Sequence, residues 1–202
     1  MTLHLRDTPI LNFLNECNKT SLEKKILDCG AGGRNPPLAI FYRDGYETHR
    51  IEILDSQIGK AEKYAKEHDM DFNIIKGDMR KLPYENESFG FVFSHHTIFH
   101  LPKAEIALTL KEMERVLKPG GLIYVNLQSH ECIGYGEGEE VREGEFIAEE
   151  HGEMVLHSYY DDDEADVYFE NYDIIMKRKF NLLIAANWCN NMAMIEYIAK
   201  KK

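Results

Sequence analysis

The chain reads Lys25-Ile26-Leu27-Asp28-Cys29-Gly30-Ala31-Gly32-Gly33, a short apolar run that stops at a cluster of glycines. An apolar run of this length that ends in Gly is typical of a buried strand entering a tight turn. The residues after it, Asn35-Pro36-Pro37, favour a helix start, and we expect that helix to run through 38–41 and to close at Gly45. A strand, a glycine turn and a helix therefore follow one another here.

The same alternation continues along the rest of the chain. By periodicity we expect a helix at 9–18 and further helices at 56–67 and around 106–117. Strands are expected at 49–53, 72–76, 89–93, 122–127 and 172–177, the last extended or followed by 180–185. Residues 193–199 fit a final strand or a helix. Strands that alternate with helices favour an α/β fold around a parallel sheet.

Composition predicts one globular domain over residues 1–202, because 44% of the residues are hydrophobic and 29% are charged. The net charge of -11 argues against the phosphate attraction that holds most nucleic-acid binders, so we expect no nucleic-acid partner. Cys17, Cys29, Cys132 and Cys189 are far apart in the sequence, and the amino terminus contains no unbroken apolar stretch. We therefore expect reduced thiols, no membrane span and a cytoplasmic location.

The acidity is concentrated in one segment. Residues 137–166 contain 13 acids and one base, Arg142, while the rest of the chain carries a net charge of +1. Glycines at 134, 136, 138 and 144 favour a loop, so we predict an acidic lid-like insertion over about 134–166. Such a segment is either a solvated surface excursion or a cover whose field favours neutral or cationic small molecules.

Residues 26–32 resemble motif I of the class I S-adenosylmethionine-dependent methyltransferases. Alternating glycines remove side chains, so a ligand can lie against the backbone at a helix amino terminus. Companion motifs follow in the family's order at later strand ends. They are Glu52 after the second strand, Gly77-Asp78-Met79 after the third, Leu82-Pro83-Tyr84 and Ser88-Phe89 before the fourth, Ser94-His95 after the fourth, and Leu117-Lys118-Pro119-Gly120-Gly121 before the fifth.

This resemblance implies a doubly wound, Rossmann-like sheet of seven mostly parallel strands with an antiparallel last strand. It also implies S-adenosylmethionine as the cofactor and methyl transfer to a small-molecule acceptor. The cofactor-binding residues that it implies are Asp28, Gly30, Gly32, Glu52, Ile53, Gln57, Asp78, Met79 and Ser94. Glu52 would accept hydrogen bonds from both ribose hydroxyls, and Asp28 suits the methionine amino group.

Histidines supply the candidates for proton transfer. His95 directly follows the fourth strand, so it is the candidate catalytic base, with a wall residue against the cofactor as the alternative. His96 and His100 are four residues apart and would share a helix face, but no third ligand accompanies them, so we predict no metal site. Four further side chains are candidates for the acceptor pocket: Tyr135, His157, Tyr159 and Tyr160.

Two other functions remain open at this point. An NAD-dependent oxidoreductase would share the glycine turn and an acid on the ribose, although Asn35 stands where its third glycine is expected. A non-catalytic S-adenosylmethionine-binding protein would keep the cofactor site without a competent acceptor site. Two departures from the family pattern, Arg34 in the glycine turn and Gly90 in the fourth strand, concern cofactor contacts more than the fold.

Overall fold

The computed structural model describes residues 8–30, 33, 36–150, 152–182 and 192–202. Its helical elements are α1 (Thr8–Asn18), α2 (Leu38–Arg43), α3 (Asp55–Glu67), the 3₁₀ turn η2 (Ile98–His100), α4 (Lys103–Val116) and the 3₁₀ turn η3 (Glu164–Phe169). Among the described residues, no helix combines the length and the apolar character that a transmembrane helix needs.

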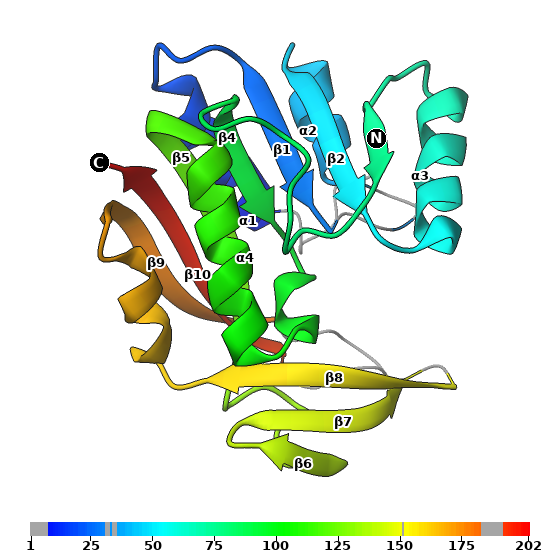
Figure 1. Cartoon of the computed structure of the whole chain (residues 1–202), viewed down its shortest axis with the longest axis vertical. Helices are drawn as coiled ribbons and strands as arrows, with labels where there is room; N and C mark the ends of the chain where they lie inside the picture. The colour runs from blue at the N-terminus through cyan, green and yellow to red at the C-terminus, as the bar shows by residue number, and fades with distance from the viewer. Residues whose placement is uncertain (1–7, 31–32, 34–35, 151, 183–191) are drawn as a thin grey trace.

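Ten strands pair into one continuous arrangement (Figure 1). They are β1 (Lys25–Cys29), β2 (Glu47–Glu52), β3 (Ile74–Lys76), β4 (Phe89–Ser94), β5 (Leu117–Ser129), β6 (Glu139–Arg142), β7 (Glu145–Glu150), β8 (Glu153–Tyr160), β9 (Tyr172–Leu182) and β10 (Met192–Lys201). Seven of them form the central sheet in the order β3-β2-β1-β4-β5-β10-β9. The first five are parallel, whereas β10 is antiparallel to both neighbours. This confirms the predicted fold class.

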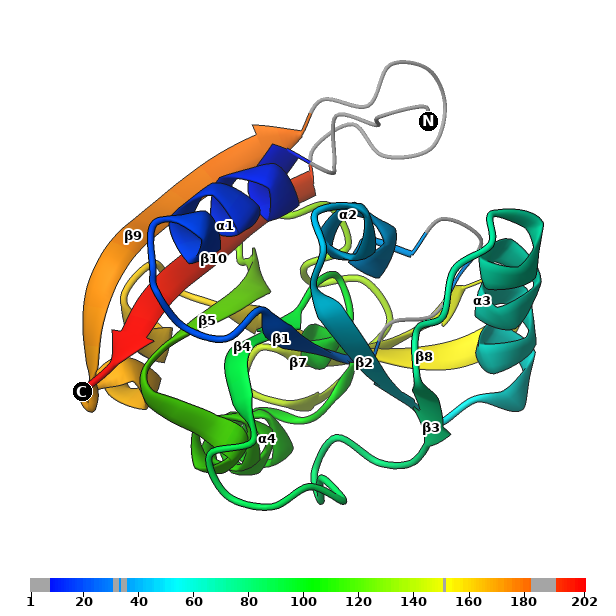
Figure 2. The ribbon, with the colours of Figure 1, turned by 90° about the horizontal axis from the view of Figure 1, so that it is seen from above.

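Helices cover both faces of the central sheet (Figure 2). On one face, Ile10 and Phe13 of α1 and Phe41 of α2 pack in one buried cluster with Phe91 and Phe93 of β4. On the other face, α4 packs its buried side chains against the alternate residues of β1, β4 and β5. Because successive side chains of a strand point to opposite faces, central strands buried on both sides read as continuous apolar runs.

Most predicted elements are present within a few residues of their expected bounds. The undecided segment at 193–199 is a strand, β10, and β9 continues the predicted strand at 172–177 as far as Leu182. The glycine turn was predicted over 30–33, of which the structure describes Gly30 and Gly33. The helix after it ends as expected, since Gly45 follows α2 with a φ of 83°.

The prediction of a loop in the acidic segment is wrong. This segment forms β6, β7 and β8, a three-stranded antiparallel sheet that lies beyond the carboxyl end of β5 in Figure 1. Two residues of β5 pair in parallel with β8, Gln128 with Tyr159 and Ser129 with Tyr160. The glycines that suggested a loop lie at or near the ends of these strands, where Gly134, Gly136, Gly138 and Gly144 have positive φ.

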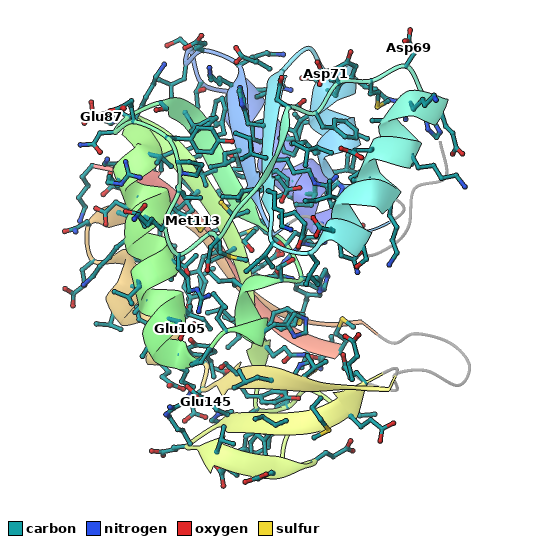
Figure 3. The ribbon with its side chains drawn as sticks, turned by 45° about the vertical axis from the view of Figure 1, so that its right-hand side comes forward. Asp69, Asp71, Glu87, Glu105, Met113 and Glu145 are labelled. Carbon is teal, nitrogen blue, oxygen red and sulfur yellow. The ribbon has the colours of Figure 1, made fainter. Side chains whose placement is uncertain are left out.

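A buried carboxylate joins this acidic sheet to the helical layer. Glu145, at the start of β7, accepts a hydrogen bond from the backbone N–H of Lys103, the first residue of α4, at 2.7 Å. The first N–H groups of a helix have no partner within the helix, so this carboxylate acts as a cap from another element. Figure 3 shows Glu145 on the acidic sheet, beyond the end of α4 that carries Glu105.

A substitution in β4 should test how closely the strands are packed. A Cβ added at Gly90 would lie 2.7 Å from the backbone oxygen of Glu23, so the packing of the strands requires glycine at this position. We expect Gly90→Ala to lower the free energy of unfolding by about 1–3 kcal/mol, measured by urea denaturation. The control is Gly59→Ala in the exposed part of α3, where nothing lies within 4 Å. That change should stabilise the protein by about 0.5–1 kcal/mol, and equal effects of the two substitutions would contradict this account.

Candidate functional site

A cavity of about 620 Å³ opens where β1, β2 and β4 end. Parallel strands present their carboxyl ends at one edge of a sheet, and ligands of doubly wound folds bind there. Eight of the ten predicted site residues line it: Asp28, Gly30, Glu52, Ile53, Gln57, Asp78, Met79 and His95. Of the other two, Ser94 is fully buried and does not line the cavity, and Gly32 lies outside the described residues.

The glycine turn leaves no room for a side chain at its first position. Gly30 has a φ of 81°, and its backbone N–H donates to the Ile51 oxygen at 3.0 Å. The hydroxyl of Thr97 donates to the Gly30 oxygen. A Cβ on Gly30 would lie 2.3 Å from Thr97 Cγ2 and 2.6 Å from Met79 Cε. Because Gly30 has no side chain, the backbone that follows β1 can lie directly against Thr97 and Met79.

Glu52 shapes the turn that follows β2. Its Oε1 accepts hydrogen bonds from the backbone N–H groups of Ile53 and Leu54, both at 2.9 Å. The side chains of Ile53 and Leu54 line the cavity and are each 53% exposed. Exposed apolar side chains beside a buried carboxylate suit a ligand that has an apolar ring next to hydroxyl groups.

A buried arginine lies among the acids of the site. Arg50 of β2 pairs in register with Asp28 of β1, is fully buried, and no described residue accepts a hydrogen bond from its guanidinium. Burial lowers the pKa of Arg50, against the opposing effect of Asp28 and Glu52. Burial also raises the pKa of Asp28 to about 7, although the charge of Arg50 opposes that rise. Asp28 Oδ2 is buried and has no hydrogen-bond partner among the described residues.

Asp78 is held in place by Arg80. The guanidinium Nε donates to both carboxylate oxygens at 2.9 Å, and the backbone N–H of Arg80 donates to Oδ1. These hydrogen bonds lower the pKa of Asp78. Arg80 also forms an ion pair with Glu105 at the start of α4. The only arginine that lines the cavity within the described ranges is thus already paired with two carboxylates.

His95 stands at the cavity end of a buried hydrogen-bonded chain. Its Nδ1 lies 3.3 Å from the hydroxyl oxygen of Tyr124, and that hydroxyl donates to Oε2 of Glu196 at 3.3 Å. Arg178 Nε donates to Oε1 of the same carboxylate at 2.6 Å. Because the Tyr124 proton is directed to Glu196, the hydroxyl oxygen accepts from His95 Nδ1–H, and Nε2 carries the lone pair of the neutral ring.

Residues that the sequence did not single out complete the far end of the cavity. Glu150 and Val155, from the acidic sheet, line the cavity together with His96, His100 and Leu101. Among the described lining residues, none of the four predicted acceptor-pocket side chains is present; these are Tyr135, His157, Tyr159 and Tyr160. Sequence periodicity could not predict that Glu150 lines the cavity, because the position of this residue depends on how β7 pairs with β8.

The expectation that His96 and His100 share a helix face is wrong. His96 has a φ of 54°, in the left-handed region, and precedes the single turn η2, which ends at His100. Its backbone N–H donates to Asn126 Oδ1 at 2.8 Å. His100 instead turns toward β8, where its Nδ1–H donates to the Leu156 oxygen at 3.2 Å. Burial and the neighbouring His157 lower the pKa of His100.

Comparison with known proteins identifies the same features. A family model described as a methyltransferase domain matches residues 27–125. Sterol 24-C-methyltransferases are 32% identical over 103 residues in Gibberella zeae and 33% over 102 residues in Saccharomyces cerevisiae. Each match covers 50% of this chain but only 27% and 26% of the relative. The chain thus spans about a quarter of the length of these relatives.

Solved structures agree over the whole fold. An S-adenosylmethionine-dependent methyltransferase from Methanosarcina mazei has a TM-score of 0.77 at 22% identity, covering 100% of this chain and 99% of its own. The 1,6-didemethyltoxoflavin-N1-methyltransferase of Burkholderia thailandensis, solved with S-adenosylhomocysteine, has a TM-score of 0.67 at 11% identity and covers 98% of this chain and 79% of its own.

The central sheet, the glycine turn and the acid at the end of β2 define a doubly wound α/β protein built to hold a nucleoside at its strand ends. The family match and the order of the motifs make the assignment specific. Over residues 27–125, which the family model matches, the chain belongs to the class I S-adenosylmethionine-dependent methyltransferase family.

The contact at Gly30 makes a double substitution informative. Gly30→Ala should lower the free energy of unfolding by about 1–3 kcal/mol, because the new methyl group collides with Thr97 and Met79. Thr97→Ser removes the nearer methyl group but keeps the hydroxyl that donates to Gly30. In urea denaturation the double variant should recover part of that loss. Strictly additive effects would show that Thr97 is not the obstacle.

Proposed function

We propose that this protein transfers a methyl group from S-adenosylmethionine to a small-molecule acceptor. The observation that carries the proposal is the single cavity that joins the glycine turn, the buried acids at the ends of β1 and β2, and His95 after β4. The family membership supports this function over that of an NAD-dependent oxidoreductase. A non-catalytic S-adenosylmethionine-binding protein is the remaining alternative. The hydrogen-bonded chain that orients His95 favours a catalytic protein, because a binding protein needs no oriented base.

The described residues fit the cofactor. Asp28 offers a buried carboxylate oxygen without a partner, which suits an amino group. Glu52 would accept from the ribose hydroxyls, and Ile53 would contact the adenine ring, with Met79 and the Arg80-bound Asp78 at the ring's edge. When bound, the cofactor supplies an electrophilic methyl group on a positively charged sulfur. The protein's main contribution is to hold an acceptor in line with that methyl group.

His95 is the proposed proton acceptor of the site. Its Nδ1–H is directed to Tyr124, so Nε2, which is buried at the cavity wall, is the ring nitrogen that would take a proton from the acceptor. Burial and Glu196 raise the pKa of Tyr124, so this hydroxyl stays protonated and continues to donate to Glu196. Tyr124 and Glu196 are then positioning residues, which keep His95 in one tautomer.

The acceptor class and cellular location follow from broader features. The net charge of -11 disfavours nucleic acid, and the cavity volume lies in the range that holds small molecules. A cytoplasmic location remains part of the proposal. It is supported by Cys17 and Cys29, which are buried free thiols.

Binding of S-adenosylhomocysteine should depend on pH through Asp28. The pKa of Asp28 is raised to about 7, so the carboxylate that binds an amino group is present at pH 8 and largely neutralised at pH 6. We expect the affinity measured by calorimetry to fall about tenfold from pH 8 to pH 6. Methylthioadenosine, which lacks the amino acid portion, should show no such change. Asp28→Asn should weaken S-adenosylhomocysteine binding and abolish the pH dependence; a parallel pH response for both ligands would contradict the role of Asp28.

Substitution of His95 should separate catalysis from cofactor binding. We expect His95→Gln to reduce turnover about 10²–10⁴-fold with the best acceptor from a panel of amines and phenols, while S-adenosylhomocysteine affinity stays the same. Tyr124→Phe should lower the fraction of His95 with its proton on Nδ1, which ¹⁵N NMR of the ring reports directly. The control is Tyr160→Phe, another buried tyrosine that does not line the cavity. Unchanged turnover in His95→Gln would remove the base from the mechanism.

A further inference from the structure

The acceptor end of the cavity presents hydrogen-bond acceptors and few donors. Glu150 contributes a carboxylate, and His100 contributes the lone pair of a ring nitrogen. The Thr97 hydroxyl, which could donate, already donates to Gly30. Arg80, the only lysine or arginine among the described lining residues, is paired with Asp78 and Glu105. A ligand that completes this end of the cavity therefore has to bring the hydrogen-bond donors.

His100 is held so that it can only accept from such a ligand. Its Nδ1–H donates to the Leu156 oxygen at 3.2 Å, which leaves the lone pair on Nε2. The ring is mostly buried and lines the cavity. Its burial and the neighbouring His157 lower its pKa, which keeps the ring neutral and Nε2 unprotonated at neutral pH.

Glu150 adds negative charge to the same end. It is the last residue of β7, and its Oε1 lies 3.3 Å from Nε2 of His157, whose ring packs 4.7 Å from that of His100. Its chain neighbour Glu149 and its register partner Glu153 on β8 add negative charge beside it. A field of one sign at a cavity raises the local concentration of ligands of the opposite sign.

Size limits the ligand further. A cavity of about 620 Å³ lies within the range occupied by one drug-sized molecule, and the cofactor takes the part bounded by Asp28, Glu52 and Asp78. The remaining part is bounded by the histidines, by Glu150 and by the apolar side chains of Leu101 and Val155. It suits a small molecule with a cationic head and a short apolar body.

We propose that this acceptor end binds a small primary or secondary amine, with His100 Nε2 and the Glu150 carboxylate accepting its N–H groups. The inference rests on the proposed function and narrows its acceptor to a basic nitrogen. The amine arrives as an ammonium ion and gives one proton to Nε2 of His95. Its nitrogen lone pair then forms the N–CH₃ bond while the C–S bond breaks, with the electron pair staying on sulfur. The products are the methylated ammonium ion, S-adenosylhomocysteine and a proton that His95 returns to water.

Two probes with one carbon skeleton test this assignment. 2-Phenylethylamine and 2-phenylethanol differ only in the group that would meet His100 and Glu150. We expect calorimetric titration of the protein saturated with S-adenosylhomocysteine to show at least tenfold tighter binding of the amine. Equal affinity, tighter binding of the alcohol, or no binding of either probe overturns the assignment.

Matched variants show whether the preference comes from these residues. Glu150→Gln and His100→Asn should each weaken amine binding at least fivefold; the Asn amide can still donate to Leu156 but has no group at the position of Nε2. Glu149→Gln removes the same charge from the same strand at a residue that does not line the cavity, and it should leave amine binding unchanged. If Glu149→Gln and Glu150→Gln weaken amine binding equally, the effect comes from the overall charge of β7 and not from a contact with Glu150, which overturns the subsite.

The experiment separates this inference from the function on which it rests. If the protein does not bind S-adenosylhomocysteine, the proposed function fails at its first step and the acceptor assignment fails with it. If it binds S-adenosylhomocysteine but discriminates against the amine, only the acceptor assignment fails. Tighter binding of the neutral probe would then direct attention to neutral acceptors.

Discussion

Parallel pairing places β1 between β2 and β4, and the rest of the site depends on this pairing. Asp28 aligns with Arg50 on one side and with Phe93 on the other, so the strands end at one edge. That edge carries the glycine turn after β1, the Glu52 turn after β2 and His95 after β4. None of these residues is near another in the sequence, and the register of three strands brings them to one cavity.

The same pairing places a buried arginine among two buried acids. Arg50 is fully buried beside Asp28 and close to Glu52, and no described residue accepts a hydrogen bond from its guanidinium. A buried charge is tolerated when opposite charges lie nearby. Here Arg50 is the positive charge beside both Glu52 and Asp28. Glu52 binds the backbone of the turn after β2, whereas Asp28 Oδ2 has no hydrogen-bond partner among the described residues. The positive charge of Arg50 therefore favours the grouping of two buried carboxylates at one edge of the sheet.

Sequence reasoning predicted the parts of the site that local patterns encode. A strand that ends in glycines, an acid two residues after Arg50, and His95 after an apolar run can each be read from a few neighbouring residues. The acceptor end could not be predicted this way. His100 is oriented by Leu156, 56 residues away, and Glu150 reaches the cavity only because β7 pairs with β8. The acidic segment contains three strands, but burial does not alternate along them, so their sequence lacks the usual sign of a strand. They are held by backbone pairing between segments, which charge and glycine content do not report.

The acidic sheet joins the central sheet through two paired residues, Gln128 with Tyr159 and Ser129 with Tyr160, and through the Glu145 cap on α4. Hydrogen bonds from His100 to Leu156 and from Ser158 to Leu101 add to this connection, so the acidic sheet is fixed against the segment that follows β4. Residues at the ends of β1, β2 and β4 line one part of the cavity, whereas β7 and β8 contribute Glu150 and Val155. Substitutions at these two positions would change the shape and charge of this part of the cavity wall while the register of β1, β2 and β4 stays the same, which makes the acidic sheet a place where the range of bound molecules can diverge or be redesigned.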